Sequence, residues 1–232
     1  MRTASLKKVI ISNPLGGWLY GKYVKYLKWR MKRALHKNGY TIIKEVHDLL
    51  QPNGYDCFAD FGMLLGFVRE HGFLKHDDDI DFSIRASKVD QKMVRLLLKR
   101  GYKFFRAFEF EGKLTELSFY RKGVSVDFFF YFEDDNGSYY YVYMPDKNLP
   151  INDPRWRVRR ADRPRLGKVK SYEIHGVCTQ IVENWDEMLT AHYGNWRVPD
   201  TKWDYTTDPR RKDIPGWGMV VDLDRAMSLL RS

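Results

Sequence analysis

The residues with the clearest chemical meaning lie in HGFLKHDDDIDFSI, residues 71–84. This segment places Asp77, Asp78, Asp79 and Asp81 within five positions and continues into apolar sequence typical of a buried strand. On a strand, Asp77, Asp79 and Asp81 share one face with neighbours about 6–7 Å apart. Carboxylates this close repel one another unless a cation lies between them, and Mg²⁺ suits such a site better than the differently spaced EF-hand Ca²⁺ loop does. A solvated acidic turn, the simpler alternative, does not explain why apolar sequence follows at once.

A third carboxylate belongs to a different stretch. Asp127 is the lone acid in VSVDFFFYF, residues 124–132. An unpaired buried carboxylate would cost several kcal/mol or would have to stay protonated. We therefore predict that Asp127 lies on a strand beside Asp79 and Asp81 and completes a three-carboxylate metal site suited to in-line phosphoryl transfer. A protonated or arginine-paired core aspartate is the alternative.

A candidate phosphate-binding turn lies just upstream, in GMLLGFVRE, residues 62–70. Gly62 and Gly66 flank a turn after strand-like sequence, so backbone N–H groups there can approach a phosphate, and Arg69 can supply a bidentate guanidinium. Two glycines alone are a weak signal. Their place between one strand and the aspartate-bearing strand gives them weight.

These segments together resemble one known family. FGMLLGFVREHGFLKHDDDIDFSI is similar to the hallmark of the LicD/fukutin family, whose pattern runs roughly GTLLGxxRxxGFIPWDDDIDI. VSVDFFFYF resembles the family strand that carries the third aspartate, and HGVCTQIVENWDEMLTAHYGNWRVP resembles its closing segment, so the resemblance spans roughly residues 40–200. The positions that match the hallmark directly are Gly62, Leu64, Leu65, Gly66, Arg69, Gly72, Phe73, Asp77, Asp78, Asp79, Ile80 and Asp81.

The resemblance implies a transferase that uses Mg²⁺, with Mn²⁺ as the alternative, held by Asp79, Asp81 and Asp127. It implies a CDP-linked small-molecule donor and, as acceptor, a glycan or lipid-linked glycan of the kind built in lipopolysaccharide or capsule biosynthesis. Met63 stands where the family usually has Thr, and Lys75 and His76 replace its Pro-Trp, which leaves the donor open. The residues that we predict to contact substrate are Gly62, Met63, Gly66, Arg69, Lys75, His76 and Asp77, with a partner for the neighbouring acids as the alternative role of His76.

The order of elements predicts the fold that must position these residues. Helical periods over residues 18–37, 41–50 and 88–99, strands around residues 55–61 and 79–84, and later β-rich runs predict an α/β (α+β) fold. With the resemblance, we expect a nucleotidyltransferase-like mixed sheet flanked by helices. Residues 153–170 are rich in arginine without a clear period and predict a long loop.

The charge of the chain is concentrated at its start. Residues 1–40 hold ten Lys or Arg and no Asp or Glu, which accounts for the whole net charge of +10. We predict a basic amphipathic arm over residues 1–40 and one catalytic domain over residues 41–232. The arm's basic face is either solvated or in contact with an anionic membrane surface or polyanion.

Composition narrows the cellular context. With 44% hydrophobic and 16% aromatic residues the chain reads as globular, and its two cysteines, Cys57 and Cys178, make neither a disulfide framework nor a zinc site. The first residues lack the apolar core of a signal peptide. We expect a cytoplasmic protein, peripheral at the inner face of the membrane.

Three functions remain open on these residues. The first is a phosphotransferase that moves phosphocholine or a phospho-alditol from the CDP-linked donor to a glycan hydroxyl and releases CMP. The second is a nucleotidyltransferase that moves NMP from an NTP to a small molecule or RNA. The third is a non-catalytic basic module for nucleic acid or a membrane surface, which ranks last because it needs no buried aspartates. Nucleic acid is therefore not an expected partner.

Overall fold

One large sheet organises the protein. The structure, a computed structural model, describes residues 14–150 and 152–231. Eight strands pair in the order β1-β2-β5-β4-β3-β10-β7-β6. Their bounds are Phe58–Ala59 (β1), Asp79–Arg85 (β2), Lys103–Phe110 (β3), Lys113–Arg121 (β4), Val124–Asp134 (β5), Gly137–Pro145 (β6), Arg155–Arg163 (β7) and Arg211–Val221 (β10).

Strand β5 closes this sheet on itself. Its first half pairs with β4 and its last residues, Phe132–Asp134, pair with β6. All pairings around the ring β5-β4-β3-β10-β7-β6 are antiparallel, so six strands form a closed barrel. Strand β2 adds to β5 from outside the ring as its parallel neighbour, and β1 pairs with β2.

The predicted fold class is therefore wrong. We expected a nucleotidyltransferase-like mixed sheet flanked by helices, and the structure has a closed antiparallel barrel with two extra strands and a few helices. Closure depends on β10, which pairs with β3 and β7 across long sequence separations. Residues 211–221 contain Pro215, Gly216 and Gly218, and the pairing is irregular between Ile214 and Trp217, so no strand signal was visible there.

Three hairpins share one turn chemistry. The turns Glu111–Gly112, Lys122–Gly123 and His175–Gly176 each place two residues at positive φ between paired strands. This geometry is the type I′ turn, whose twist matches that of the flanking strands. It joins β3 to β4, β4 to β5, and the outlying strands β8 (Val169–Ile174) and β9 (Val177–Val182).

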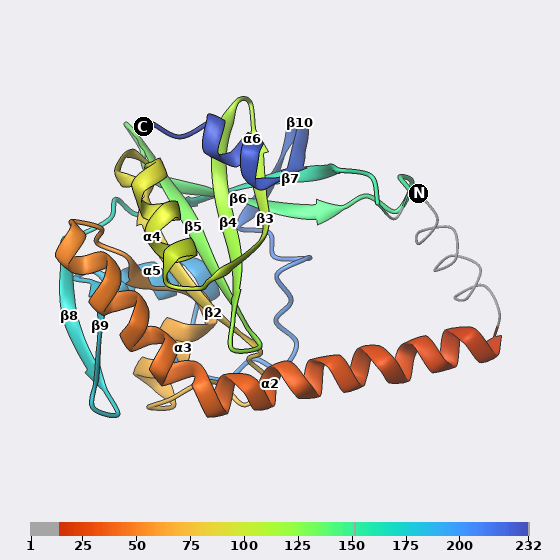
Figure 1. The fold of residues 1–232 in the computed structure, drawn as a ribbon, viewed down its shortest axis with the longest axis horizontal. Coiled ribbons are helices and arrows are strands. Elements are labelled where there is room, and N and C mark those ends of the chain that lie inside the picture. Colours follow the sequence, from red (N-terminus) through yellow and green to blue (C-terminus); the bar gives the residue numbers. More distant parts are fainter. Residues whose placement is uncertain (1–13, 151, 232) are drawn as a thin grey trace.

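Most of the helices gather against the β2–β5 part of the sheet, and the last one packs on β3 (Figure 1). Their bounds are Pro14–Leu50 (α2), Phe61–Arg69 (α3), Gln91–Lys99 (α4), Trp185–Tyr193 (α5) and Leu223–Ser228 (α6), with short 3-10 turns at Gln51–Asn53 (η1) and Ala86–Lys88 (η2). The second half of α2 packs on β2, β5 and β9 and buries Leu35, Ile42 and Val46 completely or nearly so. This packing keeps one face of β2 and β5 apolar and leaves the opposite face for the site.

The two predicted helices over residues 18–37 and 41–50 are one continuous helix, α2. Its first half leaves the body of the molecule (Figure 1), and Trp18, Tyr23 and Trp29 there are more than half exposed. The boundary predicted at residue 40 falls within this helix, and residues 1–13 of the predicted arm lie outside the described residues. Among the helices described, none is long and apolar enough to cross a membrane.

Two local predictions were also wrong. The arginine-rich segment 153–170 is not a long loop, because residues 155–163 form β7 between β6 and β10. Arg159, Ala161 and Arg163 are buried at alternate positions of β7, and because two of the three are arginines, the sequence did not show this strand period. The helix predicted from residue 88 starts at Gln91, with Asp90 as its N-cap accepting a hydrogen bond from the Met93 N–H.

Candidate active site

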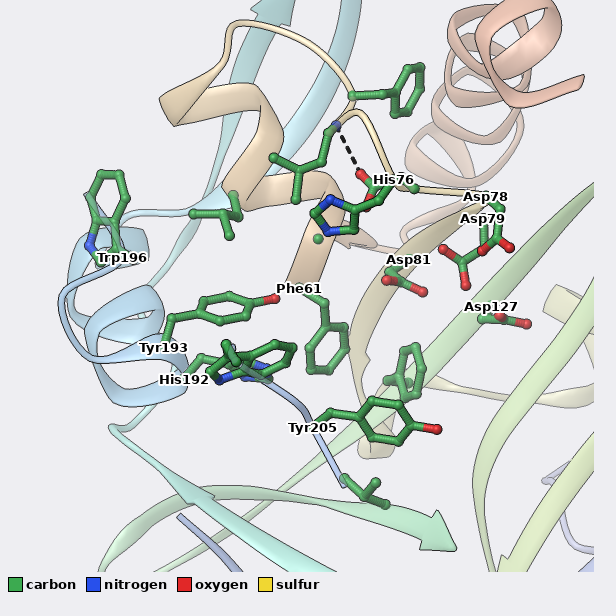
Figure 2. A pocket seen from close by; sticks show the side chains of 18 of the residues that line it. Phe61, His76, Asp78, Asp79, Asp81, Asp127, His192, Tyr193, Trp196 and Tyr205 are labelled. Atoms are coloured by element: carbon green, nitrogen blue, oxygen red, sulfur yellow. Dashed lines mark hydrogen bonds between the residues drawn. The ribbon is translucent and has the colours of Figure 1, made fainter. Parts of the chain in front are cut away.

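Three carboxylates converge from two parallel strands. Asp79 and Asp81 lie on β2, Asp127 lies on β5, and Asp81 and Asp127 are Cα partners. One carboxylate oxygen from each of the three lies within 4.8 Å of the others (Figure 2). The alternation of β2 sends Ile80 into the core, which is why its aspartates face the cavity. The structure thus brings the three predicted residues together, and their catalytic role stays a prediction.

The electrostatics of this carboxylate cluster (Asp79, Asp81 and Asp127) favour a bound cation. Burial, with repulsion from Asp127, raises the pKa of Asp79 to about 7. Burial and repulsion from Asp79 raise the pKa of Asp81 well above its usual range, and burial also raises that of Asp127. The cluster can discard its protons at neutral pH only if positive charge replaces them. Three oxygen donors at this spacing could hold a hard divalent cation.

Asp77 lies against the start of α3 and is not one of the three carboxylates of the cluster. Its Oδ2 accepts a hydrogen bond from the Leu74 N–H at 3.0 Å, and burial raises its pKa to about 6. A Cβ added to Gly62 would lie 3.1 Å from Asp77 Oδ1. Gly62 therefore lets the carboxylate lie against the helix, and both residues line the cavity.

Two other predicted substrate contacts lie elsewhere. Met63 is 2% exposed and belongs to the main hydrophobic core. Gly66 packs so closely on the following loop that an added Cβ would lie 2.4 Å from the Gly72 carbonyl oxygen. The structure places both residues outside the lining of the cavity.

Arg69, Lys75 and His76, which we predicted as substrate contacts, all border the cavity. Arg69 is held by two bonds, from Nη1 to the Trp196 carbonyl oxygen at 3.0 Å and from Nε to Glu70 at 2.8 Å. It therefore ties α3 to the segment after α5. Lys75 and His76 are exposed at the rim, where they are open to a ligand.

Sequence reasoning missed two charged residues on the barrel strands. Glu116 on β4 is 6% exposed, and burial with repulsion from Asp127 raises its pKa to about 8. Arg106 on β3 places Nη2 3.7 Å from Glu116 Oε1. Glu116 is the lone acid of LTELSFY and Arg106 the lone cation between the aromatics of FFRAF. The signal that identified Asp127 was thus present for both.

A further missed residue, Asp60, anchors the start of α3. Its carboxylate accepts hydrogen bonds from the Phe61 N–H, the Ser83 hydroxyl on β2 and the Tyr131 hydroxyl on β5, at 2.8–2.9 Å. Burial raises the pKa of Asp60 despite these partners. Asp60 therefore fixes the helix to both strands that carry the carboxylate cluster.

The opposite side of the cavity is aromatic. We call Phe61, His192, Tyr193 and Tyr205 the aromatic wall (Figure 2). The Phe61 ring lies 5.0 Å from the His192 ring, between centroids. His192 is 4% exposed, and burial together with nearby guanidinium groups lowers its pKa well below the usual range. The imidazole is therefore neutral, and its Nε2 lies 3.1 Å from Arg211 Nη2.

Between these two sides lies a cavity of about 1370 Å³. Its walls come from α3 and the loop of residues 70–78 after it, from strands β2 to β7, from α5 and from the segment of residues 195–205. His36 of α2 and Arg211 of β10 also line it. This volume exceeds the usual range for one drug-sized ligand. An aromatic side, a carboxylate cluster and flanking cations suit a nucleotide-linked, phosphorylated ligand together with a second substrate.

Comparison with known proteins agrees with the motif. Residues 54–156 match the family described as LicD/FKTN/FKRP, nucleotidyltransferase domain. An uncharacterized protein of Rickettsia prowazekii (strain Madrid E) is 36% identical over 66 residues, which cover 28% of this chain and 24% of that protein. One of Rickettsia typhi (strain ATCC VR-144 / Wilmington) is 38% identical over 61 residues, covering 26% and 19%. One of Caenorhabditis elegans is 24% identical over 197 residues, covering 81% and 50%.

The matched regions span half the length of these relatives or less. The family match confirms the LicD/fukutin resemblance and supports, in general terms, a transferase of the phosphotransferase type that modifies glycans.

Proposed function

Residues 54–156 of this chain belong to the LicD/FKTN/FKRP nucleotidyltransferase-domain family, and from this premise we propose a Mg²⁺-dependent phosphotransferase. The enzyme moves a phospho-substituent, of the phosphocholine or phospho-alditol type, from a CDP-linked donor to a hydroxyl of a cell-surface glycan. CMP is the second product. The observation that carries the proposal is the approach of Asp79, Asp81 and Asp127 to within 4.8 Å inside a cavity that also has an aromatic side.

The carboxylate cluster would hold the metal. Mg²⁺ bound by Asp79, Asp81 and Asp127 would neutralise the charge of the donor diphosphate and the charge that develops on the transferred phosphoryl group. Mn²⁺ would serve the same role. Lys75 and His76, which line the rim of the cavity, would contact polar or anionic groups of donor or acceptor.

The transfer is a single displacement at the phosphorus of the transferred group. The acceptor hydroxyl oxygen forms a bond to the phosphorus of the transferred group while the bond from that phosphorus to the bridging oxygen breaks. CMP leaves with the bridging oxygen and its electron pair. The hydroxyl proton passes to a carboxylate of the site. Asp127, buried in the cluster, is the candidate acceptor, and in that role Asp79 and Asp81 would hold the metal.

A nucleotidyltransferase that attacks the α-phosphorus of an NTP would use the same carboxylates. The two reactions differ in their products, CMP from a CDP conjugate or pyrophosphate from CTP. A non-catalytic basic module accounts for neither the buried carboxylates nor the cavity around them. It therefore remains the weakest alternative.

Product identification tests the proposal. The protein is incubated with Mg²⁺ and, in separate reactions, CDP-choline, CDP-ribitol, CDP-glycerol or CTP, together with glycan-bearing lipid extract as acceptor source. We expect CMP from one CDP conjugate and none from Asp81→Asn. Asp135→Asn, which makes the same change at an exposed turn, is the control and should keep full activity. Pyrophosphate from CTP without CMP from any conjugate would replace this function with the nucleotidyltransferase.

We also propose that the protein works at the inner face of an anionic membrane, where lipid-linked glycan acceptors are found. The projecting half of α2 supports this location. Lys22, Lys25 and Lys28 are exposed there beside the exposed rings of Trp18 and Trp29. Basic residues next to interfacial aromatics are typical of helices that lie on lipid headgroups.

A further inference from the structure

A single row of residues crosses four strands of the site. Asp81 on β2 is the Cα partner of Asp127 on β5, and Asp127 is the partner of Ser118 on β4. Ser118 is in turn the partner of Arg106 on β3. Neighbouring strands lie about 4.8 Å apart, so Arg106 starts about 10 Å beyond Asp127 on the side away from Asp81.

Neighbouring rings restrain the Arg106 side chain, but its N–H groups make no hydrogen bond to the described residues. Its Cζ lies 5.0 Å from the centre of the Phe108 ring and 5.9 Å from that of Trp156. The Glu116 carboxyl approaches Nη2 to 3.7 Å, which is too long for a hydrogen bond. The buried Nε has no partner among the described residues. Arg106 therefore presents a fixed guanidinium, with donors to spare, to the cavity that it lines.

Different kinds of side chain line the cavity on the two sides of Asp81 and Asp127. In Figure 2 the rings of Tyr193, His192 and Phe61 lie on one side of Asp81, and Asp127 lies on the other. Arg106 lies farther along the same direction, two strands beyond Asp127. The order is thus the aromatic wall, then the carboxylates, then the Arg106 guanidinium beside the Phe108 and Trp156 rings. A CDP conjugate has a matching order of base, α-phosphate and β-phosphate when its base lies against the aromatic wall.

We propose that Arg106 binds the β-phosphate of the donor, the phosphoryl group that is transferred, and that Glu116 is the positioning residue for its guanidinium. The inference rests on the proposed function and adds which residue holds which phosphate. A guanidinium in this place donates to the non-bridging oxygens on which charge develops as the bond to CMP breaks. CMP, which carries the α-phosphate alone, does not reach it.

A comparison of CMP with CDP distinguishes binding of the β-phosphate by Arg106 from a general loss of nucleotide binding. Titration calorimetry with Mg²⁺ measures binding of CMP and of CDP to wild type and to Arg106→Gln. We expect the variant to lose about 10–100-fold in CDP affinity, the usual worth of a charge-assisted hydrogen bond, and less than about threefold in CMP affinity. Arg225→Gln removes a guanidinium paired with Glu109 on the outside of β3 and should bind both nucleotides as wild type does.

A conservative Arg106 variant shows whether the loss of binding comes from misfolding, and two Glu116 variants test its positioning role. Arg106→Lys keeps the charge but loses the planar fork, so it should lose CDP affinity by a smaller factor. Glu116→Gln keeps the shape and a hydrogen-bonding group, and it should weaken CDP binding selectively while Glu116→Ala weakens it more. Equal losses for CMP and CDP, or no loss of CDP binding in either Arg106 variant, overturn the inference. Wild type that binds neither CDP nor a CDP conjugate overturns the proposed function, and this inference with it.

Discussion

Asp81 and Asp127 are Cα partners across the parallel strand pair β2–β5. This relationship joins the local aspartate motif to a strand that also belongs to the closed barrel. Because β5 is shared, the carboxylate cluster lies where the barrel meets the helix-covered strands. Glu116 and Arg106 can approach it from the barrel side for the same reason.

Removing one carboxylate should stabilise the metal-free protein. The folded-state pKa of Asp79 is about 7 against an ordinary 3.8, and that of Asp81 is also raised. A carboxyl with a raised folded pKa favours folding below its unfolded pKa, and this contribution is lost as pH rises through the folded value. Without metal, wild type should lose stability between pH 4 and 8. Asp81→Asn should melt about 2–4 °C higher at pH 8 in EDTA.

Mg²⁺ should reverse this order in the same thermal unfolding experiment. Wild type should gain melting temperature on addition of Mg²⁺ at pH 8, and Asp81→Asn should not. The exposed Asp135→Asn should follow wild type in both buffers. A wild type whose melting temperature is indifferent to Mg²⁺ would speak against a metal site in the carboxylate cluster.

Metal affinity itself should depend on pH. Because burial and mutual repulsion raise the pKa of Asp79 to about 7, protons compete with the metal at physiological pH. The Mg²⁺ dissociation constant should rise roughly tenfold per pH unit, for one displaced proton, as pH falls from 7 to 5.5. Calorimetry in buffers of different ionisation enthalpy counts the released protons. A pH-independent affinity with no proton release would contradict the raised pKa.

Two glycines of α3 should behave differently on substitution. Gly62→Ala places a Cβ 3.1 Å from the Asp77 carboxylate, so it should disturb Asp77 and weaken nucleotide binding severalfold while the protein stays folded. Gly66→Ala places a Cβ 2.4 Å from the Gly72 carbonyl oxygen, so it should cost about 1–3 kcal/mol of unfolding free energy. Denaturant unfolding and calorimetry on both variants separate the two effects.

Gly21→Ala is the control for these glycines, since nothing lies within 4 Å of its added Cβ on the exposed part of α2. It should bind nucleotide normally and be as stable as wild type or slightly more stable. Normal binding by a folded Gly62→Ala would show that the position of Asp77 does not matter.

Features of the fold and the site that depend on contacts between residues near in sequence could be predicted, and those that depend on distant segments could not. The aspartate motif and its strand are local, and β2 forms over Asp79–Arg85 as expected. Asp127 could be assigned because one acid in an apolar strand needs a partner. Barrel closure by β10 had no such signal, since it comes from distant pairings through an irregular strand. Asp60 was hidden because its buried hydrogen bonds to Ser83 and Tyr131 join three elements.

The projecting half of α2 should bind anionic vesicles through its lysines. Lys22, Lys25 and Lys28 are exposed and lie beyond the packed half of the helix, which buries Leu35 and Ile42. Changing all three to Gln should weaken co-sedimentation with phosphatidylserine-containing vesicles on the order of 100-fold, at about 1 kcal/mol per charge. Neither form should bind neutral vesicles appreciably.

A matched variant controls for net charge. Lys88, Lys92 and Lys99 are exposed at or near α4, so changing these three to Gln makes the same charge change away from α2. This variant should sediment like wild type. If both triple variants lost vesicle binding equally, net charge alone would explain the binding, and α2 would have no specific role in it.

The most direct test of the central claim is titration calorimetry of CDP-choline, CDP-ribitol, CDP-glycerol and CTP, with and without Mg²⁺, on wild type and on Asp81→Asn. We predict that wild type binds one CDP conjugate only when Mg²⁺ is present and that folded Asp81→Asn does not bind it. Binding that is indifferent to Mg²⁺ and to Asp81→Asn, or no binding of any nucleotide, would contradict the assignment of Asp79, Asp81 and Asp127 as the metal site of a CDP-dependent transferase.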